Sequence, residues 1–342
     1  MDIDFVIPWV DGSDLEWRKS KNKYSGKIDE PVDITDARYR DWDILKYWFR
    51  GVEKYAPWVH KIYFVTCGQK PDWLNENHDK LVLVNHEDYI PHEYLPTFSA
   101  NPIELNFHRI KNLSEHFVYF NDDTFIINKM EPEDFFRKGL PRDYCIEMAV
   151  EDPISPNKQD VFMHILLNNM ILLNSKYDRK EVLKKQRKKF YLVKDKKALM
   201  MNWSFLLWRR HDFFGLEYSH LASSYLKSTY EQVWRENEQI LDRVCRNKFR
   251  SAEDVNQYIF KNEQLVTGRF SPYNWRKNGK AFHMNDGASE DNNIAEMCHA
   301  IENGIYKMIC VNESQVENYE ETKQKVVHAF EKILPCKSLF EK

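Results

Sequence analysis

Short apolar runs alternate with longer amphipathic patterns along the first part of the chain. Residues 3–10, 61–66 and 81–85 are apolar or β-branched runs with the length of buried strands. Residues 39–55 place apolar side chains at helical spacing and are followed by Ala56-Pro57, which ends a helix. This alternation predicts an α/β fold with a mostly parallel, Rossmann-like sheet.

The pattern changes beyond about residue 152, where helical spacing dominates. A proline-rich loop at 95–102 and a helix at 103–110 precede the change, and a strand at 307–311 and a helix at 316–333 close the chain. Between them, three segments are predicted to be helical: 158–174, 224–246 and 252–265. We therefore predict three parts: an α/β part (1–152), a mainly helical insertion or cap (153–300), and a strand and helix returning to the α/β part (301–342).

The composition is that of a folded protein without a global charge. Hydrophobic residues make up 42% and aromatic residues 14%, which excludes disorder. Fifty basic and 53 acidic residues leave a net charge of -3, so we expect no nucleic-acid partner. Residues 180–197 form a basic cluster with interleaved apolar residues. A solvated helix face is the common explanation, and binding to anionic lipid head groups or to a polyanionic acceptor is the alternative.

The chain carries no pattern of a secreted or membrane-spanning protein. Its six cysteines include no Cys-x-x-Cys pair, so we interpret them as reduced packing residues. No basic segment followed by an apolar segment precedes the first strand, and the longest apolar stretch, 161–173, is too short to span a bilayer. We expect a cytoplasmic protein, with peripheral contact at the inner face of the membrane.

The most informative segment is residues 117–124, in which an apolar run ends in Asp122 and Asp123. Open α/β sheets bind ligands beyond the carboxyl ends of their strands, and paired carboxylates suit Mg²⁺ or Mn²⁺. A plain turn is the alternative, because Asn and Asp side chains bond their own backbone. Asp11, Gly12 and Ser13 follow the first strand and form a second candidate ligand loop.

Several ordered segments together resemble the Stealth family of sugar-1-phosphate transferases, which act in capsular and cell-surface polysaccharide synthesis and include lysosomal-enzyme N-acetylglucosamine-1-phosphotransferase. The first two regions of resemblance are carried by residues 3–14, 42–47, 52–59, 66–74, 96–99, 103–104, 108–110 and 119–123. Later regions are carried by residues 174–177, His220, 249–254, 307–313 and 339–341. The chain departs from the family pattern at Leu15, Ala222 and Glu313, where proline, proline and aspartate are expected.

The resemblance implies transfer of a hexose- or N-acetylhexosamine-1-phosphate from a UDP-sugar to an acceptor hydroxyl, with release of UMP. The acceptor would be a lipid-linked oligosaccharide or a polysaccharide. Phosphoryl transfer depends mainly on positioning and on neutralising oxygen charge. Such a site needs metal ligands, cationic donors and a base.

Roles for individual residues follow from the resemblance. Asp122 and Asp123 would form the metal or diphosphate end, and His220 would be the general base. Arg250 would clamp phosphate oxygens. The residues implied for substrate binding are Asp11, Gly12, Ser13, Glu104, His108, Arg109 and Asn312. Those implied as metal ligands are Asp123 and Glu313.

Each of these side chains also has an ordinary structural explanation. His220 could be an ordinary packing or surface histidine, and Arg250 could be a surface ion-pair residue. Glu104, His108 and Arg109 could support the loop structurally. Asn312 and Glu313 could instead cap a helix. We treat 283–287 as a loop and assign no sugar contact to the tryptophans at 42, 48, 58 and 73.

Two other functions remain as alternatives. A metal-dependent glycosyltransferase with the Rossmann-like fold of nucleotide-diphosphosugar transferases would use a similar acidic strand end but would attack the anomeric carbon and release UDP. A non-catalytic carbohydrate-binding subunit of a polysaccharide assembly is the second.

Overall fold

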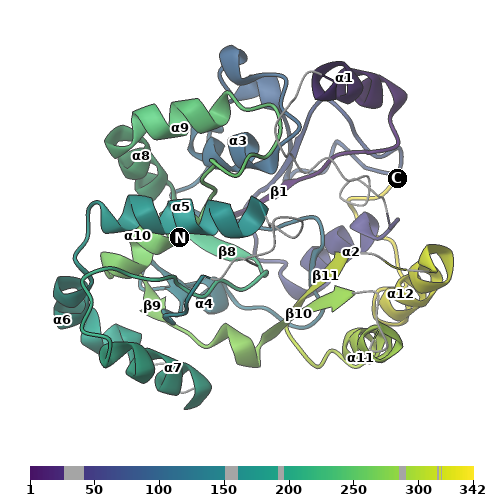
Figure 1. The fold of residues 1–342 in the computed structure, drawn as a ribbon. Helices are drawn as coiled ribbons and strands as arrows, with labels where there is room; N and C mark the ends of the chain where they lie inside the picture. Colours follow the sequence, from purple (N-terminus) through teal and green to yellow (C-terminus); the bar gives the residue numbers. More distant parts are fainter. Residues whose placement is uncertain (27–41, 151–160, 192–195, 285–289, 314–315, 317) are drawn as a thin grey trace.

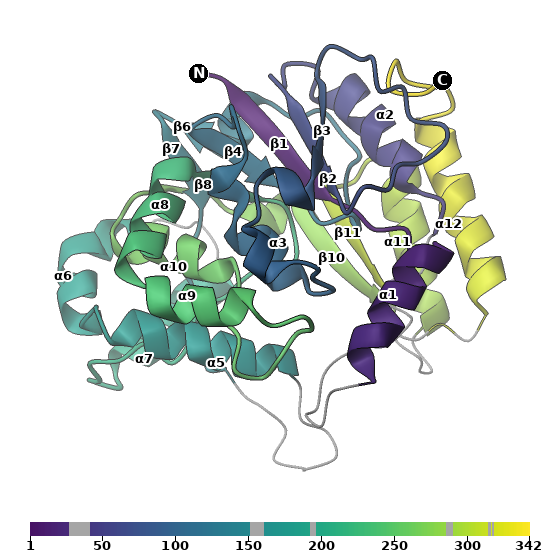
Figure 2. The same cartoon turned by 90° about the horizontal axis from the view of Figure 1, so that it is seen from above.

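A five-stranded sheet forms the centre of the computed structural model, which describes residues 1–26, 42–150, 161–191, 196–284, 290–313, 316 and 318–342. Figure 1 shows the whole fold, and the strand order of this sheet, β3-β2-β1-β4-β8, can be followed in Figure 2. The strands are β1 (Ile3–Pro8), β2 (Ile62–Thr66), β3 (Leu81–Asn85), β4 (His116–Tyr119) and β8 (Ser223–Leu226). The first four are parallel and β8 is antiparallel to β4, so the predicted mostly parallel, Rossmann-like sheet is confirmed.

The central strand β1 separates two hydrophobic cores. Phe5 packs on one face with Trp48 of α2 (Leu45–Tyr55), whereas Val6 faces the other core with Tyr230 of α8 (Lys227–Glu236). Side chains alternate between the faces of a strand, so an uninterrupted apolar run is the pattern of a strand covered on both sides. The uninterrupted apolar sequence of β1 therefore indicates that the strand is buried on both faces at the centre of the sheet.

Helices cover both faces of the sheet. Figure 2 shows α2, α11 and α12 on one side and α3, α8, α9 and α10 on the other. The helices not yet given bounds are α1 (Leu15–Ser25), α3 (Ala100–Leu105), α4 (Pro132–Phe135), α5 (Val161–Asn174), α6 (Arg179–Phe190), α7 (Lys196–Leu206), α9 (Glu238–Cys245), α10 (Tyr258–Val266), α11 (Glu290–Glu302) and α12 (Tyr319–Ile333).

Two small sheets flank the central one. The first pairs β10 (Gly279–Met284) in parallel with β11 (Met308–Glu313), which is antiparallel to β5 (Thr124–Ile126). The second has the order β6-β7-β9 (Phe136–Arg137, Leu140–Asp143, Ser271–Pro272). The predicted strand at 307–311 is confirmed, but it joins β5 and β10 rather than the central sheet.

The sequence prediction was wrong where a short strand opens a helical pattern. Residues 224–246 do not form one helix, because β8 occupies the start and pairs with β4, and the remainder divides into α8 and α9 at Asn237. The Gln264 side chain accepts a hydrogen bond from the Leu226 backbone N–H at 3.0 Å, which satisfies the edge of β8. Long-range pairing overrides local helical spacing here.

Other predicted boundaries also shift. The helix predicted at 252–265 begins only at Tyr258, and that at 103–110 is α3 followed by a separate 3₁₀ turn, Phe107–Arg109. In the helix predicted at 39–55, α2 begins at Leu45, and residues 39–41 lie outside the described part. His283 and Met284 belong to β10 rather than a loop, and 285–287 are not described.

The division at residues 152 and 300 stays a prediction. The segment 153–300 contributes β8 to the central sheet as well as the helices α5–α10. Within the described residues, every helix falls short of the length and apolar content that a bilayer crossing requires.

Gly51 provides a test of the contact between α2 and β5. A methyl group at this position would lie 2.5 Å from the Ile126 carbonyl oxygen. Alanine favours a helix by about 1 kcal/mol over glycine, but forcing a methyl into a packed contact costs roughly 1–3 kcal/mol or more. We predict that Gly51→Ala lowers the free energy of unfolding, measured by urea denaturation.

Gly26→Ala is the matched control, because its methyl would have only the Asn22 carbonyl within contact, at 3.8 Å. It should change the unfolding free energy by less than about 0.5 kcal/mol. Equal stability of the two variants would contradict the close packing of α2 on β5.

Candidate active site

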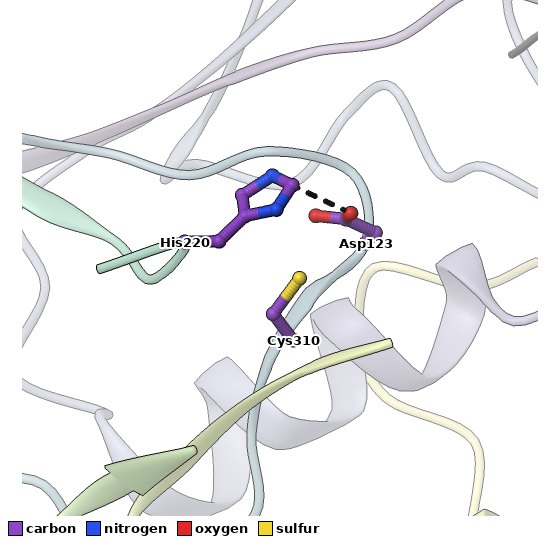
Figure 3. A group of neighbouring side chains, drawn as sticks. All are labelled: Asp123, His220 and Cys310. Atoms are coloured by element: carbon purple, nitrogen blue, oxygen red, sulfur yellow. Dashed lines mark ion pairs between the residues drawn. The ribbon is translucent and has the colours of Figure 1, made fainter. Parts of the chain in front are cut away.

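Two distant segments meet at the carboxyl edge of β4. Because β8 runs antiparallel to β4, with Ser223 opposite Tyr119, the residues before β8 lie beside those after β4. His220 Nε2 is thereby placed 3.7 Å from Asp123 Oδ2 (Figure 3). Both side chains are partly exposed and are therefore accessible to a ligand. The sequence-predicted base and acidic residue are neighbours.

Cys310 completes this group from a third segment. In the antiparallel pairing of β5 with β11, Cys310 lies opposite Thr124, and the Val311 N–H donates to the Asp123 carbonyl at 2.8 Å. One ligand atom from each of Asp123, His220 and Cys310 lies within 4.8 Å of the others (Figure 3). Burial, and then the Asp123 carboxylate, raise the pKa of the Cys310 thiol well above its usual value. Sequence reasoning missed Cys310, because only the register of two non-local strands reveals it.

His283 and Asn312 lie at the border of this group, on paired strands. The two ring centres of His220 and His283 are 6.5 Å apart, and Asn312 Nδ2 is 3.0 Å from His283 Nδ1. Burial, followed by the nearby His220, lowers the pKa of His283. Asn312 is therefore brought near the predicted base, and His283 is a second neighbour that the sequence did not indicate.

Glu313 is directed elsewhere. Its carboxylate oxygen Oε2 accepts a hydrogen bond of 2.6 Å from the indole N–H of Trp42. Among the described residues, the one group of three or more His, Cys, Asp or Glu side chains close enough to share a metal ion contains Asp123 but not Glu313. The structure thus gives Glu313 a contact that joins β11 to the segment before α2.

A buried acid lies behind the acidic turn. The Tyr119 hydroxyl donates to Glu104 Oε1 at 2.5 Å and also contacts the side chain of Asn121, in the turn that carries Asp122 and Asp123. Burial raises the pKa of Glu104 to about 7, against the hydrogen bond from Tyr119 and the charge of Arg250. Glu104 and Arg250 therefore belong to one electrostatic neighbourhood, connected to the acidic turn through Tyr119.

The loop that carries Arg250 is held by Asp254. This buried carboxylate accepts hydrogen bonds from Asn101 Nδ2 at 2.8 Å, Asn247 Nδ2 at 2.7 Å and the Ser251 N–H at 3.0 Å. Burial raises the pKa of Asp254, although these bonds and Arg250 oppose the shift. The network fixes the backbone on both sides of Arg250.

His108 and Arg109 contact α8. The Arg109 guanidinium lies 4.8 Å from the centre of the Trp234 ring, and the His108 ring is 5.7 Å from the same side chain. Burial lowers the pKa of His108 to about 3. Within the described residues, neither side chain forms a hydrogen bond, ion pair or ring contact with Asp123 or His220. Their place in the substrate site therefore stays a prediction.

The loop after β1 is organised by its own side chains. Asp11 Oδ1 accepts hydrogen bonds from the Ser13 N–H at 2.8 Å and hydroxyl at 2.6 Å, and Arg18 donates to the Gly12 carbonyl. The side chain of Gln69, which follows β2, accepts a hydrogen bond from the Asp11 N–H at Oε1 (2.8 Å) and donates one from Nε2 to Asp14 Oδ2 (2.9 Å). The loops after β1 and β2 are thus joined at the carboxyl edge of the sheet.

Comparison with known proteins decides the family. The Stealth protein conserved region 1 matches residues 1–29, and conserved region 2 matches residues 38–143. The capsular polysaccharide phosphotransferase WcwK of Streptococcus pneumoniae is 40% identical over 342 residues, covering 99% of this chain and 98% of its own. The chain belongs to the Stealth family.

Other curated relatives of this Stealth protein carry similar names. The receptor polysaccharide phosphotransferase WefC of Streptococcus oralis is 39% identical, with 99% of each chain covered. The exopolysaccharide phosphotransferase cps2G of Lactiplantibacillus plantarum is 35% identical, covering 100% of this chain and 96% of its own. The predicted resemblance and the prediction of a phosphotransferase are confirmed, and the non-catalytic alternative is wrong.

Among solved structures, the bifunctional glycosyltransferase WbbM aligns with 97% of the Stealth chain and 51% of its own, at a TM-score of 0.39 and 10% identity. A likeness this weak carries no conclusion about function.

The donor atoms around Asp123 can hold a divalent cation. A carboxylate, an imidazole and a thiol from three segments converge on one point, with room for exogenous ligands because only the cysteine is buried. Carboxylate oxygens suit Mg²⁺ and Mn²⁺, whereas imidazole and thiolate suit zinc and related ions. The predicted ligand Asp123 lies in this group in the Stealth protein, and the identity of the ion stays open to test.

The buried Glu104 predicts a dependence of stability on pH. Between about pH 4.5 and 7 the folded protein keeps the Glu104 proton and the unfolded chain loses it, so the free energy of unfolding falls as the pH rises. Glu104→Gln has no proton to lose. We predict that the free energy of unfolding of the wild type, measured by urea denaturation, falls between pH 5 and pH 7.5 by up to roughly 3 kcal/mol more than that of this variant.

Glu87→Gln, at an exposed position, is the control and should follow wild type at both pH values. The same pH dependence in wild type and Glu104→Gln would contradict a protonated Glu104.

Proposed function

We propose that this enzyme transfers a hexose- or N-acetylhexosamine-1-phosphate from a UDP-sugar to a hydroxyl of an acceptor sugar in the synthesis of a capsular or other cell-surface polysaccharide. The acceptor is a lipid-linked oligosaccharide or a growing polysaccharide. The observation that carries the proposal is the contact of His220 with Asp123 at the sheet edge where α/β folds bind nucleotides, in a chain whose relatives are named polysaccharide phosphotransferases.

In the proposed step the acceptor oxygen attacks the β-phosphorus of the donor. The new bond joins that oxygen to phosphorus, and the bond to the bridging oxygen breaks, so that UMP leaves with the electron pair. His220 accepts the proton of the attacking hydroxyl, and the Asp123 carboxylate stabilises the imidazolium that forms. The products are a phosphodiester and UMP.

A divalent cation would supply charge neutralisation for the diphosphate oxygens. We propose that Mg²⁺ or Mn²⁺ would be held by Asp123 together with oxygens of the UDP-sugar, with Asp122 beside it, and not by His220, which serves as the base. Asn312 and Arg250 would contact the sugar phosphate, since Asn312 lies near His220 through His283 and Arg250 acts electrostatically on Glu104. The predicted role of Glu313 as a further ligand stays a proposal, and its carboxylate oxygen Oε2 accepts a hydrogen bond from Trp42.

The nucleotide is proposed to bind along the ends of β1 and β2. A pocket of about 240 Å³ opens there beside the Asp11 loop, with an aromatic wall. Its lining residues are Trp9, Asp43, Leu45, Lys46, Pro71 and Trp73. Aromatic rings can stack on a uracil base, and a lysine ammonium group can form an ion pair with a phosphate.

The nucleotide released distinguishes this reaction from glycosyl transfer. Purified protein is incubated with Mg²⁺ or Mn²⁺, a panel of UDP-sugars and an extract of lipid-linked acceptors, and nucleotides are separated by chromatography. We predict acceptor-dependent UMP. Acceptor-dependent UDP would mean that the anomeric bond is broken and would replace the proposal with a glycosyltransferase.

The residue assignments predict a separation of turnover from donor binding. His220→Ala should lower kcat by about 100-fold or more, because a general base contributes roughly 10²–10⁴-fold. Donor affinity, measured by calorimetry, should change by less than about threefold. Asp123→Asn should lose turnover together with its dependence on the cation.

His328→Ala, at an exposed position of α12, is the matched control and should keep full activity. Full activity of His220→Ala would end its assignment as the base.

A further inference from the structure

The outward face of α7 is apolar. Met200 and Trp203 within α7 and Leu207 just beyond its end recur at helical spacing, and 64% of Trp203 and 82% of Leu207 are exposed. Trp208 continues this surface and is also exposed. Single exposed apolar side chains are ordinary, but four neighbouring ones that include two tryptophans mark an interaction surface.

The opposite face of α7 is fixed to the protein. Ala198 and Asn202 are buried, and Asn202 Nδ2 donates to the carbonyls of Cys145 at 2.9 Å and Phe190 at 3.0 Å. Asn202 Oδ1 accepts the Glu147 N–H at 2.7 Å. These bonds set the rotation of the helix, so the apolar face points outward as part of the fold.

Arg179 secures the end of the same helix. Its guanidinium pairs with the buried Glu147 (Nη2 to Oε1, 2.9 Å) and donates to the Phe205 carbonyl at 2.9 Å. Its backbone N–H donates to the His211 carbonyl. The turn that carries Leu207 and Trp208 is therefore held on both sides by one buried residue.

Exposed basic side chains lie on α6 and at both ends of α7. In both views α6 adjoins α7 at one end of the molecule (Figures 1 and 2). Exposed lysines and arginines are numerous on α6, at the start of α7 and just after it: Lys180, Lys184, Lys185, Arg187, Lys188, Lys196, Arg209 and Arg210. Glu181 is the only acidic residue of α6. A protein partner would need an acidic rim, whereas an anionic membrane supplies that charge over a wide plane.

We propose that α7 and the basic surface of α6 dock the enzyme on an anionic lipid bilayer, with Trp203, Leu207 and Trp208 entering the interfacial region. Tryptophan suits this region, and lysine and arginine beside it bind anionic head groups. The inference goes beyond the proposed reaction, because it requires neither donor nor acceptor. It places the enzyme on the surface that would present a lipid-linked acceptor.

The test is flotation of the full-length protein with vesicles, without substrates. Vesicles of phosphatidylcholine alone are compared with vesicles containing 30% phosphatidylglycerol. We expect binding to the second kind only, weakened at 0.5 M NaCl because salt screens the lysine and arginine charges. No binding to either kind would overturn the proposal without touching the proposed chemistry, which is measured with soluble donor.

In the Trp203→Ser/Leu207→Ser variant the vesicle partition coefficient should fall by about tenfold or more, because the two apolar side chains that enter the interfacial region are removed. Leu339→Ser is the matched control, at a position 70% exposed near the C-terminus, which both figures place away from α7. The control should bind as wild type does. Retained binding of the double variant would overturn the assignment of this face.

A second copy of the chain is the competing occupant of the apolar face. Light scattering on wild type in the absence of lipid should give a monomer, or an oligomer that the double variant leaves unchanged. An oligomer that dissociates in the Trp203→Ser/Leu207→Ser variant would assign the face to self-association and overturn membrane docking.

Discussion

The antiparallel pairing of β8 with β4 is the constraint on which the rest of the site depends. A parallel neighbour would have placed the residues before β8 at the amino edge of the sheet. Because the strand runs the other way, His220 arrives at the carboxyl edge and faces Asp123 at 3.7 Å. The same pairing holds the helices that follow β8 against the sheet face that contains Val6 and Phe117.

A second constraint is the position of the acidic turn between two sheets. β4 ends in the central sheet, and after the turn β5 enters the sheet formed with β11 and β10. Asp123 thus receives His220 from one sheet and Cys310 from the other. A carboxylate at such a junction is held by backbone bonds on both sides, including the bond from Val311, and this fixes its position before any ligand binds.

The sequence predicts those parts of the fold that depend on local pattern. The apolar runs of β1 and β2 follow directly from burial on both faces, whereas β3 is an edge strand in which Leu83 is exposed. The acidic end of β4 follows from an abrupt change to polar residues. β8 could not be predicted, since its four residues precede a helical pattern and only β4 makes them a strand. Cys310 and His283 were missed for the same reason, because their place near Asp123 depends on the register of non-local strands. The family resemblance, rather than local spacing, singled out His220.

Whether the β-phosphorus of the donor stays with the sugar is the central claim of the proposed chemistry. The most direct measurement uses a UDP-sugar carrying ³²P only at the β-phosphorus, with purified enzyme and a lipid-linked acceptor. Transfer of sugar-1-phosphate predicts that the label moves into the acceptor fraction in proportion to sugar transferred. Label that remains in the released nucleotide while sugar enters the acceptor would contradict the account.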